Sequence, residues 1–131
     1  MSNLVLVDGV AQATVLKLDG PLSLWGGVDP DSGLIVDTRH PQRGESIADK
    51  ILVMPHGRGS SSSSYVLAEI LRLGCGPAGI VLEEPDSILV TGALVARELY
   101  GVECPILVSK TAPTSGEIWL LDGGQLMRVR S

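Results

Sequence analysis

The segment from 55 to 65 gathers side chains that could do chemistry: Pro, His, Gly, Arg and Gly, then five consecutive serines and Tyr65. Arg58 stands between two glycines, where burial does not explain an arginine. Its planar guanidinium presents a fork of donors that suits a carboxylate or a phosphate. The segment therefore predicts an active-site loop that holds an anion.

Strongly apolar elements must position this loop. Residues 50–54 predict a short buried strand, and apolar residues at helical spacing from Tyr65 to Leu73 predict a helix that ends at Gly74. The first N–H groups of a helix lack partners and carry the positive end of its dipole, so they attract anions. Plain capping by one serine and a flexible linker are the alternatives. The presence of Arg58 favours an anion-binding active-site loop over both alternatives.

A second polar group lies in predicted loops, around Trp25, Gly26 and Gly27 and in the segment 37–41. Trp25 with its glycines is either a packing anchor beside a turn or a place where a ligand approaches the backbone. The two histidines, His40 and His56, adjoin a proline or a glycine and not a carboxylate that would orient them. These neighbours therefore favour a structural or surface role for each histidine over general-base catalysis.

The remaining polar residues do not complete a catalytic set. The chain has neither a G-x-S-x-G elbow nor a P-loop lysine. The charged cluster at 83–86 could supply acids or metal ligands, but its position beside a proline favours a solvated turn. Cys75 and Cys104 lack metal-ligand spacing and are interpreted as small buried hydrophobes.

The composition indicates one domain over residues 1–131 with an aliphatic core, because 44% of the residues are hydrophobic and none is Phe. A net charge of -5 without a basic stripe argues against a nucleic-acid partner. The chain contains no run of 18 apolar residues and no signal-peptide pattern at its start. We therefore expect a cytoplasmic protein that does not contact a membrane.

The order of apolar runs predicts an α/β fold. Short strands are expected first, at 4–7, 13–18, 22–24 and 34–37. The second half alternates strand and helix: strands at 50–54, 79–82 and 105–108, with a helix from Ser87 or Thr91 to Tyr100, which implies parallel strands joined by right-handed crossovers. A closing hairpin is expected at 117–121 and 125–129. The result is a β/β/α layer arrangement with a strand-rich half and a small parallel α/β half.

The sequence resembles the small, swivelling subunit of the aconitase X proteins over nearly its whole length. The segments that carry the resemblance are, in order, 25–30, Asp37, His40 and Pro41, Gly44, 50–53, 57–61, 64–67 and 77–81. The resemblance implies a domain like the mobile fourth domain of aconitase. It also implies a hydro-lyase in which a large partner subunit carries an iron-sulfur cluster or iron, with no metal or cofactor held by this chain.

The resemblance implies roles for named residues. Ser60 matches the serine that abstracts the substrate proton as a base, which requires electrostatic stabilisation of the deprotonated hydroxyl. Aconitase has an arginine just after its two serines, whereas this chain continues with Ser62 and Ser63 and carries Arg58 before its serines. The substrate-binding residues implied are Arg58, Gly59, Ser61, Ser62, Trp25, Gly26, Gly27 and His40.

The implied reaction is a metal-assisted dehydration of a small hydroxy acid. Iron in the large subunit would bind the leaving hydroxyl as a Lewis acid while Ser60 removes a proton from the adjacent carbon. The family suggests cis-3-hydroxy-L-proline or 5-phosphomevalonate as the substrate, and the five-serine run favours the first. The alternatives are a non-catalytic swivelling module that binds an anion or a partner, and a phosphoryl-carrying domain that uses His40 or His56.

Overall fold

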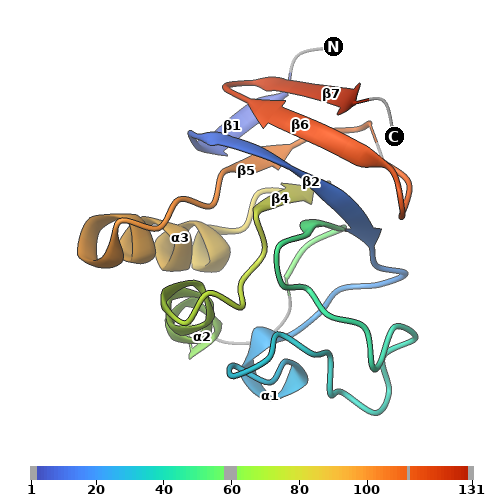
Figure 1. Cartoon of the computed structure of the whole chain (residues 1–131), viewed down its shortest axis with the longest axis vertical. Helices are drawn as coiled ribbons and strands as arrows, with labels where there is room; N and C mark the ends of the chain where they lie inside the picture. Colours follow the sequence, from blue (N-terminus) through green and yellow to red (C-terminus); the bar gives the residue numbers. More distant parts are fainter. Residues whose placement is uncertain (1–2, 58–61, 112, 130–131) are drawn as a thin grey trace.

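The computed structural model describes residues 3–57, 62–111 and 113–129, which form one mixed sheet with helices on one side (Figure 1). The strand order is β1-β5-β4-β3-β2-β6-β7. The strands are β1 (Leu4–Val7), β2 (Val10–Lys17), β3 (Ile51–Met54), β4 (Gly79–Leu82), β5 (Ile106–Val108), β6 (Ile118–Asp122) and β7 (Gln125–Val129). The helices are α1 (Leu24–Gly27), α2 (Ser62–Arg72) and α3 (Ser87–Tyr100).

The centre of the sheet is parallel, as the alternation of strand and helix predicts. Strands β2, β3, β4 and β5 pair in parallel, and β1 joins β5 antiparallel at one edge. Strand β2 belongs to two parts of the sheet, because residues 10–14 pair with β6 whereas residues 15–17 pair with β3. The hairpin β6–β7 therefore curls away from the plane of the parallel strands (Figure 1).

Two apolar cores lie on opposite faces of the parallel strands. Side chains alternate along a strand, so Ile51 and Val53 pack with Leu121 of the hairpin, whereas Leu52 and Met54 pack with the helices. Hairpin, parallel strands and helices thus form three layers (Figure 1). The α/β fold with β/β/α layers is confirmed.

The two long helices pack directly on each other. A Cβ atom on Gly92 of α3 would lie 2.6 Å from the Ser64 carbonyl oxygen and 2.9 Å from Cβ of Leu67, both on α2. Glycine therefore permits a close helix contact that no larger residue would allow. Helix α3 ends as predicted at Gly101, which has a φ of 66° and donates its N–H to the last helical carbonyls.

The first-half strands predicted at 22–24 and 34–37 are wrong. This region makes only isolated bridges among the described residues, Leu22 with Gly57, Val28 with Ile35 and Leu34 with Ser46. Leu24 begins the short helix α1, which is interrupted at Gly26 by a φ of 78°. Leu22, Leu24 and Ile35 are buried, whereas Leu34 and Val36 are exposed. Glycines with positive φ divide the segment into turns.

Several strand boundaries also differ from the prediction. Strand β2 spans Val10–Lys17 and not 13–18, and β3 excludes Lys50. Strands β5 and β6 each begin one residue later than expected, and β6 ends at Asp122. None of the helices in the described part of the chain is long and apolar enough to cross a membrane.

Candidate active site

Three chain segments meet at Gly57, a residue of the predicted anion loop and the last described one before positions 58–61. Its N–H donates a 3.0 Å hydrogen bond to Oδ2 of Asp86. On another side, Leu22 pairs with Gly57 as a parallel bridge. Strands β3 and β4 are parallel neighbours, so the segments that follow them emerge at the same edge of the sheet, where ligands of α/β proteins bind.

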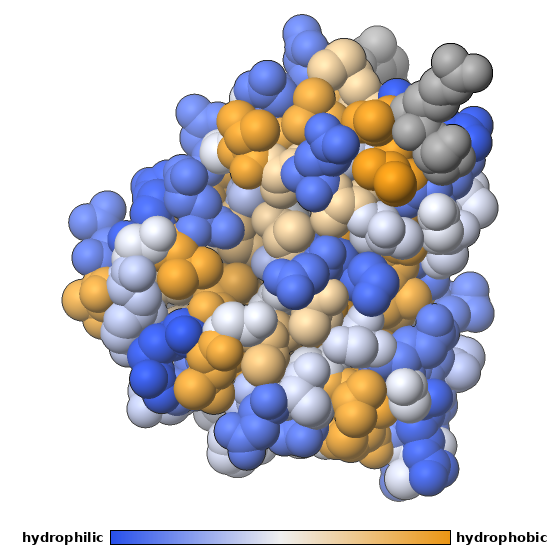
Figure 2. All heavy atoms as spheres, viewed as in Figure 1, coloured by the Kyte–Doolittle hydropathy of each residue, from blue (hydrophilic) through white to orange (hydrophobic). Residues whose placement is uncertain are grey.

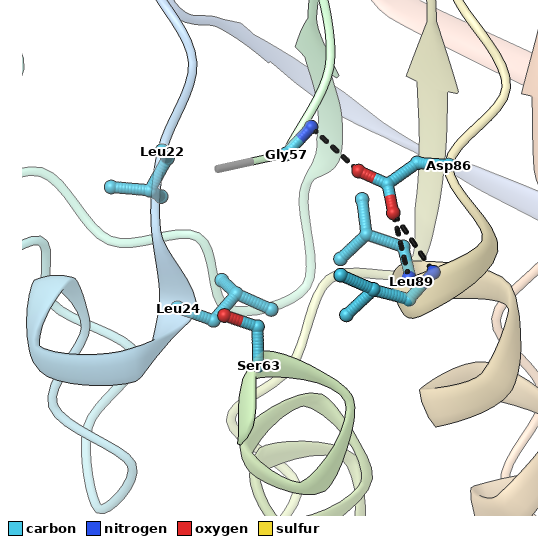
Figure 3. Close-up of a pocket in the computed structure, with 7 residues that line it drawn as sticks. Leu22, Leu24, Gly57, Ser63, Asp86 and Leu89 are labelled. Atoms are coloured by element: carbon cyan, nitrogen blue, oxygen red, sulfur yellow. Dashed lines mark hydrogen bonds between the residues drawn. The ribbon is translucent and has the colours of Figure 1, made fainter. Parts of the chain in front are cut away.

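Asp86 connects this edge to helix α3. Its Oδ1 accepts hydrogen bonds from the N–H groups of Ile88 at 3.0 Å and Leu89 at 3.2 Å, so it is the N-cap of α3. Its other oxygen, Oδ2, accepts the hydrogen bond from the N–H of Gly57 (Figure 3). The interpretation of this residue as part of a solvated turn is wrong, because the half-buried carboxylate accepts three backbone hydrogen bonds.

The contact between Gly57 and Asp86 requires glycine. A Cβ atom at position 57 would lie 2.7 Å from Oδ2 of Asp86 and 3.3 Å from Cδ1 of Leu89. Both contacts are tighter than ordinary van der Waals packing. The backbone at the start of the predicted anion loop is therefore fixed by a close approach to α3.

A pocket of about 130 Å³ opens beside this junction. It is lined by Leu22, Leu24, Gly57, Ser63, Asp86, Ile88 and Leu89 (Figure 3). Gly57 and Ser63 flank positions 58–61 in the sequence, and both line the pocket. The pocket is therefore lined by two described residues of the predicted anion loop, one on each side of positions 58–61.

The central residues of the predicted site lie outside the described residues. These are Arg58, Gly59, Ser60 and Ser61. Their proposed roles therefore stay predictions. Ser62 is exposed and begins α2, in agreement with the prediction that the serines stand at a helix start.

The second polar group of the sequence analysis, around Trp25 and in the segment 37–41, lies next to this pocket in the chain but does not line it. Leu24 of α1 lines it, and Trp25, Gly26 and Gly27 follow directly. The packing-anchor interpretation of Trp25 is wrong, because its side chain is 64% exposed. A role for these three residues toward a ligand or partner stays a prediction.

The histidines do not line this pocket. His40 lies in a turn, is 8% exposed, and accepts a 3.0 Å hydrogen bond at Nδ1 from the N–H of Gln42. Its Nε2 has no partner among the described residues. Nδ1 of His56 lies 2.6 Å from the carbonyl oxygen of Gly57. His40, which the sequence suggested as a substrate-binding residue, therefore does not line the pocket beside Gly57 and Ser63.

The described residues do not fit an iron centre. They include no group of three or more His, Cys, Asp or Glu side chains that could hold a metal ion. Burial raises the pKa of the Cys104 thiol to about 12, so it is not the thiolate that a cluster requires. Cys75 is half-buried and donates through Sγ to the Asp31 carbonyl oxygen at 3.2 Å. The interpretation as a buried hydrophobe is confirmed for Cys104.

Sequence reasoning assigned Asp86 to a solvated turn and did not single out Ser63, although both line the pocket and each left a signal. An aspartate just before an apolar-periodic segment is a typical N-cap. Ser63 lies three and four residues before Val66 and Leu67, which places it on the buried face of α2.

The fold and this site define a swivelling domain of the aconitase type, and the comparison with known families agrees. The family described as the aconitase X swivel domain matches residues 1–129. The chain belongs to this family. The resemblance stated from the sequence is therefore confirmed, as is the expected membership of a family that includes dehydratases.

Similar proteins support this assignment over most of the chain. The crystal structure of aconitase X from Thermococcus kodakaraensis in its holo-form has a TM-score of 0.86 and 32% identity, covering 98% of this chain and 97% of that one. The phosphomevalonate dehydratase small subunit of Thermococcus gammatolerans is 36% identical over 124 residues, 90% of this chain and 95% of that subunit.

A second group of relatives consists of much longer proteins. The cis-3-hydroxy-L-proline dehydratase of Pseudomonas aeruginosa is 46% identical over 101 residues, which are 77% of this chain. The match spans only 17% of that protein's length, and the same share of the enzyme from Hypocrea jecorina.

Proposed function

We propose that this chain is the small subunit of an aconitase X dehydratase and acts together with a large subunit. The observation that carries the proposal is the match to phosphomevalonate dehydratase small subunits over nearly the full length of both chains. The name of those relatives implies a large subunit as their partner. The described residues supply no set of metal ligands, so we place the iron centre in that partner.

We propose phosphomevalonate as the substrate, which reverses the preference drawn from the serine run. The alignments with phosphomevalonate dehydratase small subunits extend over 90% and 92% of this chain in two Thermococcus species. Those with hydroxyproline dehydratases extend over 77% and 78% of this chain but over only 17% of those proteins, whereas 95% of each of the two Thermococcus small subunits is covered. The higher identity of 46% to the Pseudomonas enzyme keeps cis-3-hydroxy-L-proline as the second candidate.

In this proposal the chain holds the substrate and moves a proton. Ser60 removes a proton from the carbon next to the one that loses the hydroxyl group. A neutral serine is a poor base in water, so its deprotonated form needs nearby positive charge. The guanidinium of Arg58 and the dipole at the start of α2 are the sources that this chain offers.

The described residues support this role by fixing the backbone that precedes Ser60. The hydrogen bond from Gly57 to Asp86 and the bridge from Gly57 to Leu22 hold that backbone between α3 and the segment before α1. Precise placement of a catalytic group accounts for much of its effect on rate. The Gly57 junction is thus the positioning element of the proposed base.

The experiment that tests the proposal is reconstitution. The chain is combined with the large aconitase X subunit from the same source, and loss of water is measured with phosphomevalonate and with cis-3-hydroxy-L-proline. We expect turnover of phosphomevalonate by the pair and none by either subunit alone. A pair that forms but acts on neither substrate would favour the non-catalytic binding module instead.

The phosphoryl-carrier alternative is not supported by the geometry. A histidine that accepts a phosphoryl group must be reachable by the donor, yet His40 is almost fully buried. Nδ1 of His56 lies close to a backbone carbonyl oxygen.

A further inference from the structure

Two lysines lie at the carboxyl ends of the parallel strands. The chain has three lysines, Lys17, Lys50 and Lys110, in a protein with a net charge of -5. Lys17 is the last residue of β2, and Lys110 follows the end of β5 by two residues. Both line a pocket of about 50 Å³, together with the last residues of β3 and β4, Met54 and Leu82. Two of the three lysines are therefore gathered at the edge of the sheet where α/β proteins bind ligands.

This lysine pocket borders the predicted active-site segment. Pro55, the first residue of that segment, also lines the pocket. Its carbonyl oxygen accepts hydrogen bonds from the N–H groups of Glu83 at 3.1 Å and Glu84 at 3.2 Å. Gly57, two residues further along the chain, lines the pocket beside Asp86. The lysine pocket and the candidate active site therefore lie at the two ends of the stretch from Pro55 to Gly57.

Hydrogen bonds fix the backbone that carries the two lysines. The N–H of Lys17 donates to Oγ of Ser115 at 2.7 Å. The N–H of Ser109 donates to the carbonyl oxygen of Leu82 at 2.9 Å, and its Oγ accepts from the N–H of Thr111 at 3.1 Å. Lys110 lies between these two anchored residues. A backbone that is already in place lowers the entropy cost of binding a ligand.

The charges of the lysine pocket favour an anion. Lys17 and Lys110 are exposed and form no ion pair within the part of the chain that the structure describes. Glu83 is the one carboxylate among the described residues that line the pocket, so two ammonium groups face one negative charge. An ammonium group binds phosphate as a compact point charge. The exposed Thr111 adds a hydroxyl donor to the same pocket.

The two candidate substrates differ in the number of their anionic groups. Phosphomevalonate has a carboxylate at one end and a phosphate at the other, so it needs two places that accept negative charge. Cis-3-hydroxy-L-proline has one carboxylate and a basic ring nitrogen. The predicted anion loop with Arg58 supplies one such place. A second cationic pocket beside that loop is therefore of use to phosphomevalonate but not to hydroxyproline.

We infer that the lysine pocket binds the phosphate group of phosphomevalonate, with the ammonium groups of Lys17 and Lys110 on its oxygens. The inference rests on the proposed function, and it leaves the carboxylate of the substrate to the predicted anion loop. Lys17 and Lys110 thereby become the residues of this chain that select a phosphorylated substrate.

The first test compares Lys17→Gln and Lys110→Gln with Lys50→Gln in the reconstituted two-subunit enzyme. Lys50 is the matched control, because it directly precedes β3 and so lies at the opposite end of the parallel strands. We expect each pocket variant to raise KM for phosphomevalonate about tenfold or more, the effect of one lost hydrogen bond to a charged group. Lys50→Gln should keep KM within about twofold of the wild type. Glu83→Gln should lower KM, because it removes a charge that repels phosphate.

The second test measures binding without turnover. The chain alone is titrated with inorganic phosphate and followed by its backbone amide signals in NMR spectra. Phosphate should shift the signals of Lys17, Lys110 and Thr111 more than that of Lys50, and sodium chloride at the same ionic strength should not. The shifts should be smaller in the chain that carries both Lys17→Gln and Lys110→Gln.

The outcomes are distinct. A wild-type pair that turns over neither substrate overturns the proposed function, whereas the phosphate titration still reports on the pocket. An active pair whose KM for phosphomevalonate is unchanged in both pocket variants overturns the inference alone, as does phosphate that leaves the amide signals of Lys17 and Lys110 unmoved. Weaker association of the subunits in these variants, with KM unchanged at saturating large subunit, also overturns it, because the lysines would then contact an acidic segment of the partner.

Discussion

The N–H of Gly57 and the carboxylate of Asp86 form a 3.0 Å hydrogen bond between residues 29 positions apart in the chain. The same carboxylate caps α3. One side chain thus joins the segment after β3 to the start of a helix that follows the neighbouring strand. The segment that carries the proposed base begins from this fixed point, so its position depends on how β3, β4 and α3 pack together.

Asp86 variants can separate capping from positioning. Asp86→Asn keeps an oxygen that can accept from the α3 amides, but its NH₂ group cannot accept from Gly57. We expect urea unfolding to show a loss of about 1 kcal/mol or less. Turnover of the reconstituted enzyme should fall by about tenfold or more, because a displaced catalytic group loses rate steeply.

The comparison variant is Asp86→Ala, which removes all three acceptor bonds and should cost about 1–2 kcal/mol in the free energy of unfolding. Wild-type turnover in the Asn variant would show that the bond to Gly57 does not position the site.

The contact of Gly92 with α2 predicts a strong steric effect. Gly92→Ala places a methyl group 2.6 Å from the carbonyl oxygen of Ser64, so the helices must separate. We expect a loss of about 1–3 kcal/mol in the free energy of unfolding, measured in urea. The gain in helix propensity from alanine, about 1 kcal/mol, offsets only part of the clash.

Gly20→Ala is the matched control for that substitution. A Cβ atom at position 20 meets nothing within 4 Å, and its φ lies outside the left-handed region. Its free energy of unfolding should stay within about 0.5 kcal/mol of the wild type. Equal stabilities of the two variants would contradict the close helix packing described above.

The buried thiol of Cys104 predicts a fall in stability at alkaline pH. Its pKa is raised by burial from 9.0 to about 12, so the unfolded chain loses this proton at a lower pH than the folded chain does. The contribution is constant below about pH 9. It is lost between about pH 9 and 12, by up to about 1.4 kcal/mol per pH unit.

Urea unfolding at pH 8 and pH 10 measures this loss, and Cys104→Ala should reduce the difference between the two values. The half-buried Cys75 should react with an alkylating reagent in the native chain before Cys104 does. Faster reaction of Cys104 would contradict its burial.

The second half of the fold could be predicted from the sequence because each element has a clear period and a clear end. Helix α3 shows this well: its apolar spacing predicts the helix, and Gly101 ends it in the left-handed conformation. The segment from 19 to 50 could not be predicted in the same way. Leu22, Leu24 and Ile35 are buried there without regular pairing, and burial alone resembles a strand pattern.

The candidate site could be predicted in outline only. The serines were correctly expected at the junction of a strand and a helix, since α2 begins at Ser62. The bond from Asp86 to Gly57 could not be read from spacing, because it depends on β3 and β4 being neighbours in the sheet. The sequence showed a carboxylate at Asp86, beside Pro85, but not that three backbone N–H groups donate hydrogen bonds to it.

The most direct test of the account is the turnover of a reconstituted enzyme that carries Ser60→Ala. If Ser60 is the base, turnover should fall by several powers of ten, since general-base and electrostatic effects of roughly 10²–10⁴ and 10²–10³ are lost together. The free energy of unfolding should change by less than about 1 kcal/mol. Ser64→Ala, prepared in parallel, should retain wild-type turnover. A Ser60→Ala enzyme that keeps about a third or more of wild-type turnover would contradict the claim that this chain supplies the base.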